Sequence, residues 1–164
     1  MTDRRLLEVD YATAPTAGNG LVYNAATGLF VPKDLYPTAD SASEGTAQST
    51  SSATPATIGG CSVSVTVKTG GAVLLTARGT YSLSTTTDLV AFGIYRDARQ
   101  ITEITQLLSP SASNTGKTGC FALSVVDKPA AGTYTYTLKW ASTSGVATAY
   151  CRAASIQAVQ LVCS

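Results

Sequence analysis

The chain has 164 residues, of which 45% are hydrophobic and 13% charged, and its formal net charge at pH 7 is +1. A chain of this length normally forms one domain, and this composition supplies enough apolar residues for a core. A net charge so close to zero argues against nucleic acid or an anionic membrane as the main partner. The sequence contains no histidine, which excludes histidine-dependent catalytic triads and removes the usual zinc ligand.

The first twenty residues carry mixed charges and end in Pro15, Gly18 and Gly20, so any regular structure there must be short. The stretch LVYNAATGLFV, residues 21–31, then places two apolar triplets on either side of a segment with turn formers at both ends. This pattern predicts a small β-hairpin. Because a lone hairpin is marginally stable in water, we expect it to lie against a neighbour.

Residues 38–60 are about half Ser and Thr, and Ile58 is their only large apolar residue. Such a segment cannot offset the entropy of its own ordering by burial. We therefore expect residues 1–37 to form an N-terminal arm, residues 38–60 a flexible linker, and residues 61–164 the folded domain.

From Cys61 onward, apolar and polar residues alternate as they do in half-buried strands, and the alternation places Cys61 inside. Further strands are predicted in seven segments: residues 72–83, 89–95, 100–108, 120–126, 134–140, 146–153 and 155–162. Eight short strands without a substantial helix predict an all-β antiparallel sandwich, best fitted by a jelly roll. An immunoglobulin-like sandwich is the nearest rival, although Trp140 lies late in the chain and no cysteine pair brackets it.

The segment LVAFGIY, residues 89–95, is apolar on both faces of the predicted strand, so we expect a cover on each face. In a small sandwich, the second cover usually comes from another subunit. The sequence therefore predicts association, with Ala91, Phe92 and Tyr95 at a subunit interface.

Catalytic chemistry finds no support in the sequence. The acids after residue 60 are Asp88, Asp97, Glu103 and Asp127, each expected on solvated surface, as are Arg96 and Arg99 at a turn. The segment SASNTGKT, residues 111–118, lacks the first glycine of a phosphate-binding loop. The cysteines fit no metal spacing, and because no export signal is evident we expect reduced thiols and no disulfide. We expect no cofactor and no enzymatic activity.

Two segments resemble those of a known class of protein. GLVYNAATGLFVPKDL, residues 20–35, resembles the short linking element of bacteriophage fibre and head-fibre proteins, although Phe30 stands where that family often has Trp. The second segment, residues 131–162, resembles the last hairpins of trimeric jelly-roll tips in phage structural proteins, similar in outline to tumour-necrosis-factor and C1q-like heads. Its sequence is AGTYTYTLKWASTSGVATAYCRAASIQAVQLV. Together the two segments cover about a third of the chain.

The resemblance implies a non-enzymatic phage virion protein, a homotrimeric capsid decoration or head fibre assembled in the host cytoplasm. Its arm would grip a major capsid or tail protein through large apolar side chains: Leu6, Leu7, Tyr11, Val22, Tyr23 and Phe30. A short tail fibre or minor tail protein that binds a host-surface glycan is the alternative. A free carbohydrate-binding module is a third hypothesis, against which stands the lack of an export signal or catalytic partner domain.

Overall fold

The computed structural model describes residues 19–24, 29–34, 39–85, 88–107 and 118–161. The chain divides into two compact units, Met1–Pro37 and Thr38–Ser164, and each is described by itself. Within the described residues all regular structure is β, and every strand pair is antiparallel.

The first unit contains the hairpin that the sequence predicts. Its strands are β1 (Asn19–Asn24) and β2 (Leu29–Asp34). They pair with Val22 opposite Val31 and Tyr23 opposite Phe30, so two residues of each apolar triplet are partners across the hairpin. A two-stranded hairpin by itself is only marginally stable in water.

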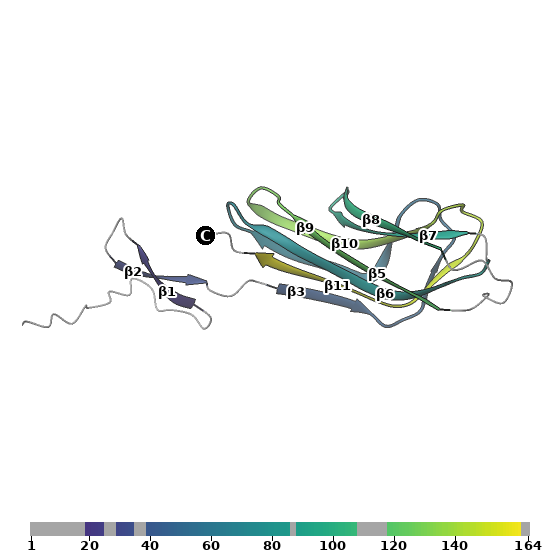
Figure 1. The fold of residues 1–164 in the computed structure, drawn as a ribbon, viewed down its shortest axis with the longest axis horizontal. Coiled ribbons are helices and arrows are strands. Elements are labelled where there is room, and N and C mark those ends of the chain that lie inside the picture. The colour runs from purple at the N-terminus through teal and green to yellow at the C-terminus, as the bar shows by residue number, and fades with distance from the viewer. Residues whose placement is uncertain (1–18, 25–28, 35–38, 86–87, 108–117, 162–164) are drawn as a thin grey trace, which may run out of the picture. The chain divides into compact units, whose positions relative to one another are not determined.

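The second unit is a β-sandwich (Figure 1). One sheet has the order β5-β10-β7-β8, and the other has the order β3-β11-β6-β9 with β4 also paired to β11. The prediction of an all-β antiparallel sandwich is confirmed. The strands are β3 (Ala39–Glu44), β4 (Gln48–Thr50), β5 (Ala56–Val67), β6 (Ala72–Leu83), β7 (Leu89–Arg96), β8 (Arg99–Leu107), β9 (Gly119–Asp127), β10 (Gly132–Ser142) and β11 (Ala149–Leu161).

The order of the strands distinguishes between the two sandwich types that the sequence suggests. When β4 is set aside and the other eight strands are counted from β3, the sheets run 1-8-3-6 and 2-7-4-5. This is the strand order of a jelly roll, in which the first and last strands are neighbours in one sheet. In an immunoglobulin domain the first and last strands belong to opposite sheets, so the rival fold does not fit.

The prediction of a flexible linker over residues 38–60 is wrong. This segment supplies β3, β4 and the beginning of β5, and β3 is the first strand of the jelly roll. Its small polar side chains bury little, but its backbone pairs with β11 from Ala39 opposite Val159 to Glu44 opposite Ala154. Hydrogen bonding to an ordered neighbour thus replaces the burial that the segment lacks.

Side chains from this segment also close one edge of the other sheet. The Gln48 side chain accepts a hydrogen bond from the Gly59 amide at 2.9 Å and donates one to the Gly59 carbonyl at 3.1 Å. Asp40 accepts a hydrogen bond from the Ser64 amide at 3.2 Å. The edge strand β5 is thereby covered by side chains that imitate a neighbouring strand.

The last two predicted strands, residues 146–153 and 155–162, form the single strand β11. A register shift against β6 between Cys151 and Ala153 leaves Arg152 and Ala153 both exposed. This bulge interrupts the alternation of inward and outward residues, which is why the sequence reads as two strands.

An aromatic cluster occupies the core between the sheets. Phe92 stacks on Phe121 with ring centroids 3.8 Å apart, and it also contacts Tyr81 and Trp140 at 5.4 and 6.3 Å. Phe121 can lie there because its cross-strand neighbour is Gly79. A Cβ atom at Gly79 would come within 2.6 Å of both the Phe121 ring and the Ala153 carbonyl oxygen.

Candidate functional site

The predicted attachment residues belong to the first unit. Leu6, Leu7 and Tyr11 lie outside the described residues. Val22 and Tyr23 lie on β1 and Phe30 lies on β2, where Tyr23 and Phe30 are direct cross-strand partners. The hairpin therefore brings these three positions into one small structure.

The structure separates the three predicted subunit-interface residues. Phe92 points into the aromatic core and is completely buried in a single chain. It therefore cannot serve as an exposed contact, which corrects the prediction for this residue. Ala91 and Tyr95 lie on the outer face of the strand, and each retains 8% of its accessible surface.

The chain itself supplies the second cover of β7. The Tyr95 ring lies against Gly93, with a ring carbon 3.0 Å from the place a Cβ would occupy. The Lys139 ammonium sits 4.7 Å from the centroid of the Tyr95 ring, and the Tyr95 hydroxyl donates a hydrogen bond to Gln100 at 2.9 Å. An apolar strand with both faces covered thus gives no reason by itself to invoke another subunit.

Asp88 is buried, which corrects the expectation that it lies on solvated surface. Its carboxylate accepts hydrogen bonds from six donors: the Leu89, Ser144 and Ala147 amides and the Ser142, Thr143 and Ser144 hydroxyls, at 2.6–3.3 Å. Burial alone would raise the pKa of Asp88, but hydrogen bonds from Ser142, Ser144 and the Leu89 amide outweigh it and hold the pKa well below its usual range. The Asp88 carboxylate therefore stabilises the loop between β10 and β11.

Asp127 and Arg96 are also withdrawn from solvent, again against expectation. The Arg96 guanidinium donates to Asp127 at 2.7 Å, with 14% and 11% of the two side chains exposed. The Tyr136 hydroxyl donates to the same carboxylate oxygen at 2.9 Å. Because Arg96 ends β7 and Asp127 ends β9, this contact ties the two sheets together. Asp97, Arg99 and Glu103 are exposed as expected.

Neither carboxylate resembles a catalytic group, since Asp88 is hydrogen-bonded on both oxygens by the loop it holds and Asp127 is paired with Arg96 and Tyr136 between the sheets. Among the described residues, no three His, Cys, Asp or Glu side chains lie close enough to hold a metal ion. The structure buries Cys61, as its place in the alternation predicts, and also Cys151, and leaves Cys120 exposed, all three as free thiols. Most of the segment 111–118 lies outside the described residues.

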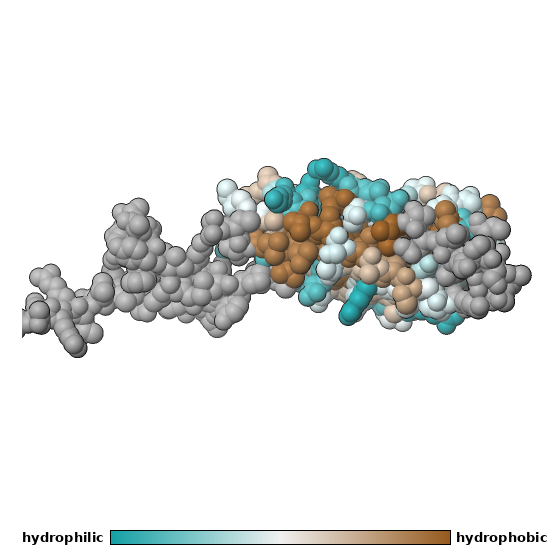
Figure 2. Space-filling view, viewed as in Figure 1, coloured by the Kyte–Doolittle hydropathy of each residue, from teal (hydrophilic) through white to brown (hydrophobic). Residues whose placement is uncertain are grey.

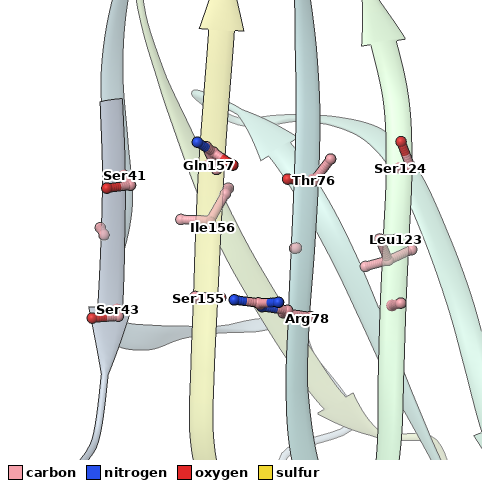
Figure 3. Close-up of a pocket in the computed structure, with 12 residues that line it drawn as sticks. Ser41, Ser43, Thr76, Arg78, Leu123, Ser124, Ser155, Ile156 and Gln157 are labelled. Carbon is pink, nitrogen blue, oxygen red and sulfur yellow. The ribbon is translucent and has the colours of Figure 1, made fainter. Parts of the chain in front are cut away.

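The outer face of the β3-β11-β6-β9 sheet carries a groove of about 660 Å³ (Figure 3). Its lining contains Arg78 and six uncharged polar residues: Ser41, Ser43, Thr76, Ser124, Ser155 and Gln157. A second hollow of about 490 Å³ continues past Arg78 along Gly79, Thr80 and Ala153. The groove and the hollow lie side by side on this face and share Ser43, Arg78 and Ser155.

An apolar row crosses the same face of this sheet next to the groove. Val126 and Val159 both lie opposite Leu74, and Val126 is 46% exposed. Figure 2 shows that apolar side chains gather on one part of the sandwich surface, bordered by polar ones. Among the described residues no helix has the length and hydropathy needed to cross a membrane.

Comparisons with known proteins add little to this geometry. No family model and no curated protein matches the chain. Two structures of infectious bursal disease virus are similar: that of the Gx strain, at 11% identity and a TM-score of 0.36 over 83% of this chain, and that of the Gt strain, at 10% and 0.31 over 94%. The chain spans 40% and 47% of the length of those two proteins. Values this low establish no relationship, and the fold rests on the strand order described above.

Proposed function

We propose that this protein is a non-enzymatic structural protein of a bacteriophage particle, a trimeric capsid decoration or head-fibre protein attached through residues 1–37. The observation that carries the proposal is the division of the chain. A small hairpin with apolar residues on both strands forms one unit, and a jelly roll with its own core forms the other. A two-stranded hairpin is marginally stable in water by itself, and such a hairpin joined to a domain with its own core suits an attached appendage.

The resemblance of residues 20–35 to the linking element of phage fibres also supports attachment through the N-terminal unit. In this proposal Val22, Tyr23 and Phe30 contact a major capsid or tail protein, together with Leu6, Leu7 and Tyr11. The trimer rests on the resemblance, with Ala91 and Tyr95 as the candidate contacts. Sedimentation equilibrium of the full chain at micromolar concentration tests it, and a monomer under these conditions would remove the trimer from the proposal.

The attachment test compares particles assembled with the full chain and with a chain lacking residues 1–37. We expect the shortened protein to remain folded and to be absent from purified particles, because the jelly roll keeps its core while the hairpin contacts are lost. A finer variant replaces Tyr23 and Phe30 together by Ser, and Val146→Ser, at an exposed loop position, is its matched control. Gel densitometry against the major shell protein measures occupancy. Undiminished occupancy after the deletion would show that the jelly roll makes the attachment.

A short tail fibre or minor tail protein is the second candidate. The groove on the outer face of the sheet favours it, because a concave surface lined by polar side chains is suited to binding a host-surface glycan. Imaging of particles labelled after residue 161 distinguishes the two, since label on the capsid supports decoration and label at the tail supports the fibre.

A further inference from the structure

The hydroxyl groups on the outer faces of the two sheets differ in one respect. On the β5-β10-β7-β8 sheet two pairs of hydroxyls bond to each other across strands: Ser62 with Thr137 at 3.1 Å and Thr66 with Thr133 at 2.9 Å. In the groove of the other sheet, the side chains of Thr76, Ser124 and Ser155 have no hydrogen-bond partner among the described residues. Their hydrogen-bonding capacity is directed to solvent.

Arg78 is the only charged side chain in the lining of the groove. Its guanidinium makes no ion pair or hydrogen bond with any described residue, and Figure 3 shows it reaching from β6 toward Ser155 on β11. By contrast, Arg96 is occupied by Asp127. The nearest acid in the adjacent hollow is Glu44, whose own carboxylate accepts a hydrogen bond from the Thr46 amide.

The polar side chains are arranged in rows across the sheet. Gln157, Thr76 and Ser124 form one row, and Ser155 and Arg78 belong to the next. Adjacent strands lie about 4.8 Å apart, so the four strands under the groove span roughly 14 Å. This width accommodates a short chain of sugar rings laid across the strands.

We propose that this groove binds an acidic saccharide, in which Arg78 holds a sugar carboxylate and the unpaired hydroxyl and amide groups around it exchange hydrogen bonds with sugar hydroxyls. A guanidinium binds a carboxylate through two parallel hydrogen bonds, and one cation with no acid beside it in the groove lining matches one negative charge. Ser, Thr and Gln side chains both donate and accept, as sugar hydroxyls do. A nucleic acid would require several cations, which the lining does not supply.

The affinity is expected to be weak, because no aromatic ring faces outward in the groove to stack on a sugar. The site belongs to the jelly roll and does not depend on attachment to a particle, so it is tested on the full chain in solution.

The test is a titration of isotope-labelled full chain, followed by amide chemical shifts, with tetragalacturonate as the probe. We expect saturable shifts at residues 76–78 and 155–157. The fully methyl-esterified tetrasaccharide keeps the hydroxyls but has no charge, and it should bind about tenfold more weakly or worse, since a charge-assisted contact is lost. Arg78→Gln should cause a similar loss, whereas Arg99→Gln, an exposed arginine at the β7–β8 turn, should cause none.

Three results would overturn the proposal. The first is equal affinity for the charged and esterified saccharides, and the second is an equal loss in the Arg78→Gln and Arg99→Gln variants. The third is the same shifts and affinity with sodium acetate or inorganic phosphate, which would mark a simple anion site. Ser155→Ala provides an independent variant in case Arg78→Gln unfolds, and it should weaken tetragalacturonate binding without changing the response to acetate.

Discussion

Asp88 and Asp127 both lie largely out of water, but the chain satisfies their charges in different ways. Asp88 receives six hydrogen bonds from neutral groups, five of them within residues 142–147. Asp127 receives one cation, Arg96, and one phenol, Tyr136, from two strands of the opposite sheet. The first arrangement shapes a loop and the second joins the sheets, so the partners of a buried carboxylate reveal what it stabilises.

Removal of Asp88 is expected to have the largest effect. Asp88→Ala leaves amide and hydroxyl donors of the loop without an acceptor, and we expect a loss of about 3 kcal/mol in the free energy of unfolding. Urea denaturation measures the loss, and hydrogen exchange should show faster exchange at the Ser144 and Ala147 amides. A loss no larger than that of Glu103→Ala, an exposed control, would contradict this account.

Asp127→Ala should lower the free energy of unfolding by less, about 2 kcal/mol. Only Arg96 and Tyr136 lose their acceptor, and solvent partly reaches the site. The accompanying exchange should spread to both sheets near Arg96 and Tyr136 and spare residues 142–147. If Asp127→Ala instead loosens the same loop as Asp88→Ala, the two carboxylates do not have separate roles.

Tyr136→Phe isolates one contact of the second arrangement. It removes only the hydroxyl that donates to Asp127, so we expect a loss of about 1 kcal/mol. The same change in an Asp127→Ala background should have a much smaller effect, and the double-mutant cycle measures the difference. Equal effects in the two backgrounds would mean that the hydroxyl acts through other groups.

The two arrangements should also respond to opposite ends of the pH scale. The pKa of Asp88 is lowered by folding, so its contribution is present above its unfolded value of about 4 and declines as the pH falls below that value. Burial and the Asp127 carboxylate raise the pKa of Tyr136, so its contribution is present below about pH 10 and declines as the pH rises above it. In the Asp88→Asn variant, the denaturation midpoint should no longer fall at acid pH, but it should still fall at alkaline pH.

Much of the jelly roll could be predicted from the alternation of residues, because one face of each strand meets the core. Strands β5, β6, β9 and β10 follow that rule over much of their length. Strand β7 is apolar on both faces and is covered on both, as its sequence predicts, but the second cover comes from its own chain and not from another subunit. The predicted count of eight strands equals the number in the jelly roll, with β4 set aside, only because two errors cancel. The bulge at Cys151–Ala153 divided β11 into two apparent strands, while β3 was missed because Ser, Ala and Asp carry no apolar signal.

The groove and the two carboxylates could not be predicted from the sequence. Arg78 looks like any outward residue until β3, β11 and β9 are placed beside it. Asp88 lies 54 residues before Ser142 in the chain, and a single polar residue before a strand gives no indication of a distant loop that will enclose it. The side chains that cover the outer face of β7 could not be predicted either, because the contact between Tyr95 and Lys139 depends on the register of β7 with β10.

The pairing of β3 with β11 also determines how the jelly roll would respond to mechanical load. Ala39 lies beside Val159 near the end of β11, whereas residues 142–148 precede its start. A pull between Ala39 and that distant loop runs along β3 and strains its backbone hydrogen bonds together in shear. A pull between Ala39 and Leu161 acts across the two strands and breaks the same hydrogen bonds one after another. The domain should therefore resist force far better along its length than across its two adjacent ends.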